Sequence, residues 1–367
     1  MNELINAGSV RTLTGILGQT APAIRWDRTA AAASGLDRLV LRARTDLLAG
    51  ALVADIAGSP SPGYATAARS FRAALQVPEF TGWFVWPVSE AAVTLALDSG
   101  AAGDFDDCLA LVAALTPRLT SEFAVRRLLA RDPERALAAA REWAGSADEH
   151  VRRLASEGTR PYLPWAVRVP ALIQRPQATI PILDALYRDP SEYVRRSVAN
   201  HLNDLARHAP DPVVDTARRW LTAPDANTAR LVRHGLRTLV KKGHPDALAL
   251  LGFTPGQVDV SGPSLDRNVL TLPDELAFTF AVTNTGTGDV RLALDYRVHY
   301  RKANGRESAK VFKISTVTLG PGESRSVTKR HAFRQMTTRV HYPGVHALEL
   351  QINGVAQGRT EFLVELP

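Results

Sequence analysis

Residues 193–211 read YVRRSVANHLNDLARHAPD, and this stretch predicts an amphipathic helix. Its apolar residues recur at spacings of three and four and therefore share one face: Val194, Val198, Leu202, Leu205 and Ala209. The opposite face is polar, and we expect it to meet solvent; it carries Arg196, Asn200, Asn203, Asp204 and Arg207. Asparagine and aspartate are poor helix formers away from a helix start, so helix propensity does not explain their presence there.

Related helical segments recur along the chain. The motif VRR stands at 125–127, 151–153 and 194–196, and VRH stands at 232–234. The last two intervals, of 43 and 38 residues, are typical of helical-hairpin repeats of the HEAT type. In such repeats each hairpin buries its apolar face on its neighbours, and equivalent helices line one wall. Residues 1–255 are therefore predicted to form an α-solenoid of HEAT-like repeats.

The pattern changes to strands in the last third of the chain. The Gly- and Pro-containing segment LGFTPGQVDVSGP (251–263) marks the boundary. Beyond it, apolar and polar residues alternate, with turn signals at NTGTGD (284–289) and KANGR (302–306). The pattern gives about seven short strands, the number typical of an immunoglobulin-like β-sandwich. Residues 256–367 are predicted to form that sandwich, so the fold class is a multidomain α-then-β protein.

Composition narrows the class of protein. The 367 residues are 45% hydrophobic, as in globular proteins. No apolar run is long enough for a transmembrane helix, and the first residues, MNELINAGSV, lack a secretory signal. The single cysteine, Cys108, cannot form an internal disulfide and suits a reducing compartment. These features predict a cytoplasmic protein with no membrane association, and the scattered histidines argue against a structural zinc site.

Positive charge is concentrated in the middle of the chain. Residues 118–243 hold 22 Lys and Arg against 14 Asp and Glu, a net charge of +8, whereas the whole chain has +7. Twenty of these cations are arginines, whose guanidinium groups bind phosphate oxygens well. The concentration favours a polyanionic partner such as nucleic acid. The alternative for any single arginine is that it braces adjacent repeats.

Three residues in this basic region are candidates for chemistry, and each has a structural alternative. Glu122 follows Thr120 and Ser121, either of which can cap a helix with the glutamate in its first turn. Trp165 lies in the proline-stiffened segment RPYLPW (160–165) and is either core filler or an aromatic platform beside a ligand. Asp204 is either an ordinary surface charge or a functional carboxylate.

Several segments, in this order and spacing, resemble the AlkC branch of the HEAT-like-repeat DNA alkylation repair glycosylases. These are TSEFAVRRLL (120–129), RPYLPWAVR (160–168), YVRRSVANHLNDLARHAPD (193–211) and VRHGLRTLVKKGHPDAL (232–248). The segment HYPGVHALELQINGVAQGRTEFLV (341–364) is similar to the immunoglobulin-like domain attached to many AlkC proteins. The resemblance covers nearly the whole chain and is loosest in the first hundred residues.

The resemblance implies a monomeric DNA glycosylase of base excision repair. Such an enzyme hydrolyses the N-glycosidic bond of cationic alkylated bases, namely 3-methyladenine and in this branch 3-methylcytosine, in duplex DNA. The family acts without flipping the base and without a metal or nucleotide cofactor. By motif, Glu122 and Asp204 match the catalytic carboxylates, and Trp165 matches the aromatic residue that packs against the deoxyribose and backbone of the lesion. Phe123 belongs to the same wall.

The residues expected to bind DNA are basic. By position, the phosphate candidates of the helical part are Arg152, Arg153, Arg160, Arg195 and Arg196. The basic residues with which the sandwich is expected to grip DNA are Lys310, Lys313, Lys329, Arg330 and Arg339. Two other functions stay open: a non-catalytic HEAT-repeat scaffold for a protein partner, and a binder of damaged or branched DNA that has lost hydrolysis. The retention of both acids favours the enzyme.

Overall fold

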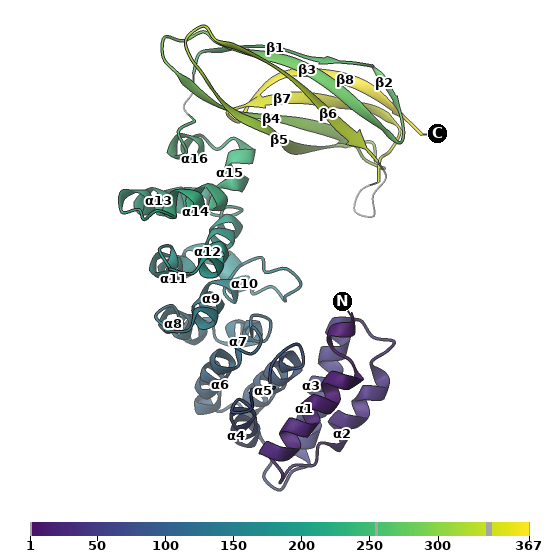
Figure 1. Cartoon of the computed structure of the whole chain (residues 1–367), viewed down its shortest axis with the longest axis vertical. Helices are drawn as coiled ribbons and strands as arrows, with labels where there is room; N and C mark the ends of the chain where they lie inside the picture. The colour runs from purple at the N-terminus through teal and green to yellow at the C-terminus, as the bar shows by residue number, and fades with distance from the viewer. Residues whose placement is uncertain (1, 254–255, 335–339, 367) are drawn as a thin grey trace. The chain divides into compact units, whose positions relative to one another are not determined.

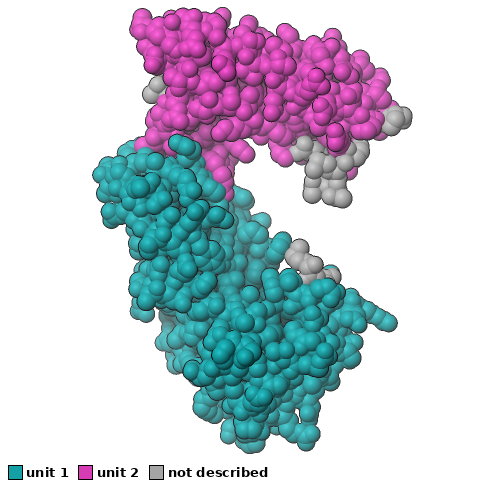
Figure 2. Space-filling view, viewed as in Figure 1, with its two compact units in different colours: residues 1–235 teal, residues 236–367 magenta. Residues whose placement is uncertain are grey.

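The computed structural model describes residues 2–253, 256–334 and 340–366 (Figure 1). Over these residues the chain forms sixteen α-helices followed by eight β-strands. It divides into two compact units, residues 1–235 and residues 236–367 (Figure 2). None of the described helices combines the length and the apolar character needed to cross a membrane. The α-then-β fold class predicted from the sequence is confirmed.

The first unit is helical throughout. Its α-helices are α1 (Ala7–Thr20), α2 (Asp27–Ala31), α3 (Leu41–Ala57), α4 (Tyr64–Ala74), α5 (Val85–Ser99), α6 (Ala102–Leu115), α7 (Val125–Arg131), α8 (Pro133–Trp143), α9 (Glu149–Glu157), α10 (Pro170–Gln174), α11 (Ile180–Leu186), α12 (Glu192–Leu205), α13 (Pro210–Thr222) and α14 (Thr228–Gly235). Short 3-10 turns lie at Asn2–Leu4, Ala32–Gly35 and Pro176–Thr179.

The later helices of this unit form successive hairpins. Helix α8 packs on α9, α11 on α12 and α13 on α14. Across the hairpins, α12 contacts both α9 and α14, while α11 contacts both α8 and α13 (Figure 1). Two layers result, one of α9, α12 and α14 and the other of α8, α11 and α13. The succession of helical hairpins predicted from the recurring VRR and VRH motifs is confirmed.

Helix α12 shows how the sequence builds this stack. The apolar stripe at Val194, Val198, Leu202 and Leu205 is fully or almost fully buried. Gly235 of α14 lies directly against Leu202, because a Cβ atom added there would come within 2.8 Å of the Leu202 Cδ2 atom. The two helices therefore approach more closely than a larger residue would permit.

The second unit begins with two short helices, α15 (Arg237–Lys242) and α16 (Pro245–Leu250), followed by the strands. The strands are β1 (Val258–Leu265), β2 (Val269–Thr271), β3 (Asp274–Asn284), β4 (Val290–Arg301), β5 (Glu307–Leu319), β6 (Ser324–Phe333), β7 (Gly344–Ile352) and β8 (Val355–Glu365). One sheet has the order β1-β3-β6 and the other β2-β8-β7-β4-β5. Buried residues of both sheets, among them Phe278, Leu292 and Leu348, form one hydrophobic core.

The sandwich departs from the sequence prediction in one detail. The strand beyond the expected seven is the three-residue β2, which pairs in parallel with β8 and is too short to show a period of two. Helix α16 ends at Leu250 and β1 begins at Val258, on either side of the boundary expected at residue 255. The compact units divide earlier, after Gly235, because Leu248 and Phe253 pack against Ala293 of β4.

Candidate active site

Glu122 lies in a turn immediately before α7 and its side chain is almost fully buried. The Thr120 hydroxyl donates a hydrogen bond of 2.9 Å to Glu122 Oε2, and Arg153 of α9 forms an ion pair with the same oxygen. Helix α7 begins at Val125 without a side-chain cap, so the expectation that Thr120 or Ser121 caps this helix is wrong. Thr120 instead orients the glutamate.

Asp204 lies near the end of α12, with only 3% of its surface exposed. Its Oδ2 atom accepts a hydrogen bond of 2.9 Å from Nε of Arg160. Asn203 is also buried, so the expectation that both residues face solvent is wrong. The reason is tertiary: the segment after α9 packs over this end of α12, where Tyr162 stacks on His208.

Glu157, the last residue of α9, is a further buried carboxylate that the sequence analysis missed. Its Oε1 atom lies 2.6 Å from Nη1 of Arg160 and 3.5 Å from Nη2 of Arg153. Its Oε2 atom accepts a hydrogen bond of 2.6 Å from the hydroxyl of Ser197 on α12. The available signal was the spacing, since Glu157 follows Arg153 by four residues and precedes Arg160 by three, and opposite charges at such spacings along a helix meet.

Together these side chains form a continuous chain of ion pairs in the order Glu122, Arg153, Glu157, Arg160 and Asp204. We call it the ion chain. The ion chain contains three carboxylates and two guanidinium groups, so acidic groups outnumber basic ones. Buried ion pairs lose hydration that their attraction only partly returns, and stability alone does not explain a row of five charges. Such an arrangement is typical of a functional site.

The pKa values follow from this burial and pairing. Burial raises the pKa of Asp204 above its ordinary value, although Arg160 acts in the opposite direction. Burial lowers the pKa of Arg160, but Glu157 and Asp204 outweigh this effect and the pKa lies above its ordinary value. Arg160 therefore stays charged and holds two carboxylates in place.

The ion chain borders a cavity of about 260 Å³ within the first unit. Glu122, Glu157 and Arg160 are its charged lining residues, whereas Asp204 lies behind Arg160. The other lining residues are mainly apolar: Trp83, Trp86, Leu119, Thr120, Phe123, Leu163, Pro164 and Trp165. The rings of Trp86 and Phe123 stack with centroids 4.6 Å apart. The cavity thus places carboxylates beside flat apolar walls.

Trp165 is held at the edge of this cavity in a conformation that is unusual for its type. The residue is 78% exposed and its φ is 62°, a left-handed value rare in residues other than glycine. The alternative that Trp165 fills the core is therefore wrong. An exposed aromatic ring on a conformationally restricted loop suits contact with a ligand.

Arg126 fixes both ends of the loop that carries Trp165. Its side chain is completely buried and donates hydrogen bonds to the carbonyl oxygens of Gly158, Arg160 and Val167, at 3.0, 2.6 and 3.0 Å. Burial lowers the pKa of Arg126 to about 10, so it remains protonated at neutral pH. Arg126 was not predicted as a site residue, because the repeated VRR motif does not distinguish it from the other arginines.

With the geometry established, comparison with known proteins is informative. The solved structure of Pseudomonas fluorescens alkylpurine DNA glycosylase AlkC, bound to DNA containing an abasic site analog, is 32% identical to this chain. The match covers 99% of both chains with a TM-score of 0.83. This chain belongs to the AlkC family. The resemblance drawn from the sequence is thereby confirmed.

Further matches agree with membership of the AlkC family. Residues 110–235 match the DNA alkylation repair enzyme family, and residues 259–366 match the family described as "Uncharacterised protein YhaZ, C-terminal Ig-like domain". The "Uncharacterized protein YhaZ" of Bacillus subtilis (strain 168) is 37% identical over 262 residues, which is 71% of this chain and 72% of that protein. The match over 110–235 includes all five residues of the ion chain.

In this AlkC-family chain the predicted phosphate-binding arginines fall into two groups. Arg153 and Arg160 belong to the ion chain, and the side chain of Arg152 is largely buried in an ion pair of 2.6 Å with Asp189. Arg195 donates to the carbonyl oxygens of Asp189 and Pro190 but lines an open groove, together with Arg196, whose side chain is 68% exposed. Their role in DNA binding stays a prediction.

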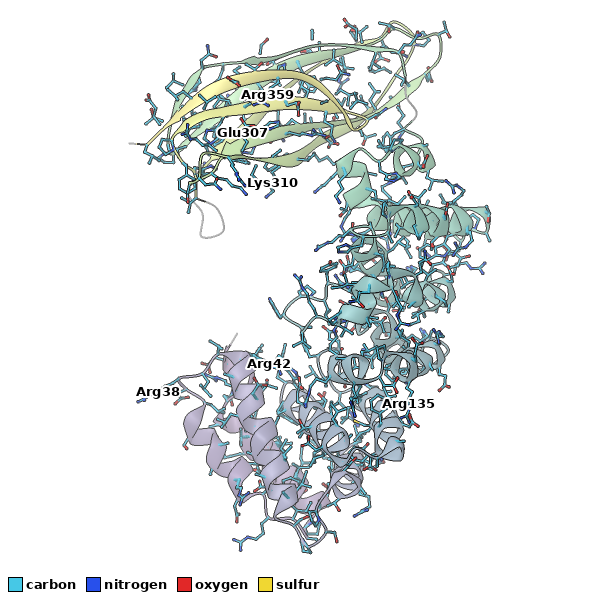
Figure 3. All side chains as sticks on the ribbon, turned by 180° about the vertical axis from the view of Figure 1, so that it is seen from behind. Arg38, Arg42, Arg135, Glu307, Lys310 and Arg359 are labelled. Carbon is cyan, nitrogen blue, oxygen red and sulfur yellow. The ribbon has the colours of Figure 1, made fainter. Side chains whose placement is uncertain are left out.

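The basic residues predicted to grip DNA in the second unit lie on its strands. Lys310 is labelled on β5 in Figure 3, with its ammonium group over the ring of Phe312. Lys313 stands opposite Asp295 in the β4–β5 ladder. Lys329 and Arg330 lie exposed on β6, and Arg339 is outside the described residues. Over the described residues, no group of three or more His, Cys, Asp or Glu side chains could hold a metal ion.

Proposed function

We propose that this protein is a DNA glycosylase that releases cationic alkylated bases, chiefly 3-methyladenine and also 3-methylcytosine, from duplex DNA. The observation that carries the proposal is the ion chain, which brings Glu122, Glu157 and Asp204 together beside an aromatic-lined cavity. Membership of the AlkC family and the DNA-bound structure of the similar Pseudomonas protein support it.

Hydrolysis of the N-glycosidic bond of a cationic base mainly requires negative charge close to C1′ of the sugar. Methylation at a ring nitrogen makes the base a cation, so the bond between C1′ and the base breaks with its electron pair moving to the base, which becomes neutral. Positive charge then develops on the sugar, and carboxylates close to C1′ stabilise it. Water adds to C1′ and passes its proton to a carboxylate, which completes hydrolysis.

The geometry suggests a division of labour. Glu122 and Glu157 line the cavity, so we assign to them the direct contact with the sugar and water. Asp204 contributes negative charge behind the cavity wall through its pairing with Arg160. Trp165 at the edge presents its exposed ring to the deoxyribose and backbone. An exposed platform of this kind fits excision without base flipping, the strategy implied by the family resemblance.

The test is release of methylated bases from alkylated duplex DNA, with EDTA present. We expect release by the wild-type protein and strong loss in Glu122→Gln and Asp204→Asn, with Glu134→Gln on the exposed face of α8 as the control. Absence of release by the wild type with intact DNA binding would favour a non-catalytic binder. Full activity in both carboxylate variants would overturn the assignment of the site.

A further inference from the structure

A second open feature lies between α12 and α14, apart from the cavity that holds the ion chain. It is a groove of about 230 Å³ with a floor that includes the buried Ala199 and Leu231. Its polar lining residues are Glu192, Arg195, Arg196, Asn227, Arg230 and His234. We call it the α12–α14 groove. Three guanidinium groups and one imidazole are thus collected around a single carboxylate.

The position of Glu192 in this groove is unusual. Its Oε1 atom lies 3.1 Å from Nη2 of Arg230 and 3.4 Å from Nη2 of Arg196, so one oxygen is shared by guanidinium groups from two helices. Hydrogen bonding from Arg196 and the charge of Arg230 hold the pKa of Glu192 below its ordinary value. A phosphate oxygen between two arginines has the same surroundings.

The groove is connected to the ion chain through α12. Arg196 and Asp204 lie eight residues apart on this helix, a rise of about 12 Å. That length corresponds to roughly three or four nucleotide steps of one strand of B-form DNA. Asn200 stands between them and its Oδ1 atom lies 3.0 Å from Nε2 of His234, which holds the imidazole on the rim of the groove.

We propose that the α12–α14 groove binds a backbone phosphate of duplex DNA through Arg196, Arg230 and His234, and that Glu192 occupies the place of the phosphate in the free protein. This inference rests on the proposed function, since it places one DNA strand along α12 with the lesion beside the ion chain. Glu192 keeps the two arginines oriented before DNA arrives and is displaced when the phosphate enters.

The chemistry of the groove favours a phosphodiester over an acidic peptide. Planar guanidinium forks from two helices suit the tetrahedral oxygens of one phosphate. The apolar part of the groove, by contrast, is only Ala199 and Leu231, which offers little surface for the side chains of a peptide. The groove also lies within residues 118–243, which hold the net charge of +8. Repeated phosphates along a strand match such an extended positive region.

The proposal predicts a gain of affinity on removal of an acid. Glu192→Gln frees Arg196 and Arg230, so the Kd for a fluorescently labelled duplex carrying an abasic site analogue should fall by about threefold or more. The matched control is Glu134→Gln on α8, which removes the same charge and an exposed ion pair with Arg175, the residue after α10. Fluorescence anisotropy between about 50 and 200 mM salt measures both.

Removal of a cation should have the opposite effect. Arg230→Gln should raise the Kd by about tenfold. The plot of the logarithm of the association constant against the logarithm of the salt concentration should also become less steep, by about one unit of slope, because one phosphate contact is lost. Its control is Arg218→Gln, which breaks an exposed ion pair with Asp215 on α13. Equal affinities for Glu192→Gln and Glu134→Gln, or an unchanged slope in Arg230→Gln, would overturn the proposal.

Two further measurements separate this inference from its alternatives. Inorganic phosphate at constant ionic strength tests for a site that takes free anions: thermal stabilisation by phosphate that depends on Arg230, without any effect of Arg230→Gln on DNA binding, would contradict a DNA site. Base release is measured in parallel. If the wild-type protein releases no base, the proposed glycosylase activity is wrong. The binding comparison would still show whether the α12–α14 groove binds a DNA phosphate.

Discussion

Helix α12 forms two interfaces within the same layer, and they handle charge in opposite ways. Toward α9 and the following loop, Arg160 is buried between Glu157 and Asp204. Only the part of Arg160 that lines the cavity can contact a ligand. Toward α14, Arg196 and Arg230 are exposed and share one exposed carboxylate. The interface with α9 therefore holds its charged groups in fixed pairs, and the interface with α14 leaves its arginines accessible to a ligand.

The difference has an energetic basis. A buried guanidinium that loses its partners, or a buried carboxylate left alone, keeps the full penalty of lost hydration. An exposed ion pair contributes little to stability because water solvates both partners when they separate. Substitutions in the ion chain should therefore affect folding and catalysis together, whereas those in the α12–α14 groove should affect binding alone.

The largest expected effect on stability is in the ion chain. Arg160→Met leaves Asp204 buried without its cation and Glu157 with Arg153 alone, and should lower the free energy of unfolding by about 3–5 kcal/mol. Arg196→Met, in the open interface, should change it by no more than about 0.5 kcal/mol. Urea denaturation of both variants measures the contrast. Equal destabilisation would show that burial does not distinguish the two interfaces.

The next effect concerns Glu157, which lines the cavity between the two arginines of the ion chain. Glu157→Gln keeps the shape and removes the charge, so the single-turnover rate of base release should fall by about 10²–10³-fold. Glu149→Gln at the exposed start of the same helix is the control. An unchanged rate in Glu157→Gln would show that Glu157 only positions Arg160 and does not act on the substrate.

Much of this contrast could be predicted from the sequence, but only along single helices. The periodicity of α12 predicted its buried stripe, and the motifs around Glu122 and Asp204 predicted that both acids belong to one site, where the structure joins them through Arg153, Glu157 and Arg160. The alternation of apolar and polar residues likewise predicted the β-sandwich, apart from the three-residue strand β2.

The rest depends on contacts between segments far apart in the chain. Asp204 was expected on a solvent-exposed face because periodicity cannot show that the loop after α9 covers it. The sharing of Glu192 by Arg196 and Arg230 joins residues on different helices. The positive φ of Trp165 is partly local, since Trp165 follows Pro164 in a turn in which the Ala166 N–H donates to the Leu163 carbonyl oxygen. The contacts of Arg126 with the carbonyl oxygens of Gly158 and Val167, at the two ends of this loop, could not be predicted.

A smaller effect is the pH dependence of stability that arises from His201 at the interface between α9 and α12. Burial lowers the pKa of His201 to about 3, and its Nδ1 atom lies 2.9 Å from the Ser156 carbonyl oxygen of α9. Because the folded pKa is below the ordinary 6.5, the contribution of His201 to stability is present above that pH and is lost as pH falls toward 3.

The slope expected from His201 is about 1.4 kcal/mol per pH unit below about pH 6, and it should disappear in His201→Asn. His150→Asn, at the exposed start of α9, should keep the wild-type slope. Denaturant unfolding at several pH values measures the three proteins. An identical slope in His201→Asn would show that this histidine does not report on the α9–α12 interface.

The last effect is on binding more than on stability and concerns Trp165, which lies beside the ion chain but is exposed like the groove residues. Trp165→Gly relieves an unfavourable φ of 62° while it increases the entropy of the unfolded chain, so the free energy of unfolding should change by less than about 1 kcal/mol. The Kd for damaged duplex DNA should nevertheless rise by about fivefold or more, because an aromatic contact with the nucleotide is lost. Val167→Ala, at an exposed residue of the same loop, is the control and should bind as the wild type does. Retained affinity in Trp165→Gly would show that the ring is not a DNA platform, and a large loss of stability would show that the loop depends on it for folding.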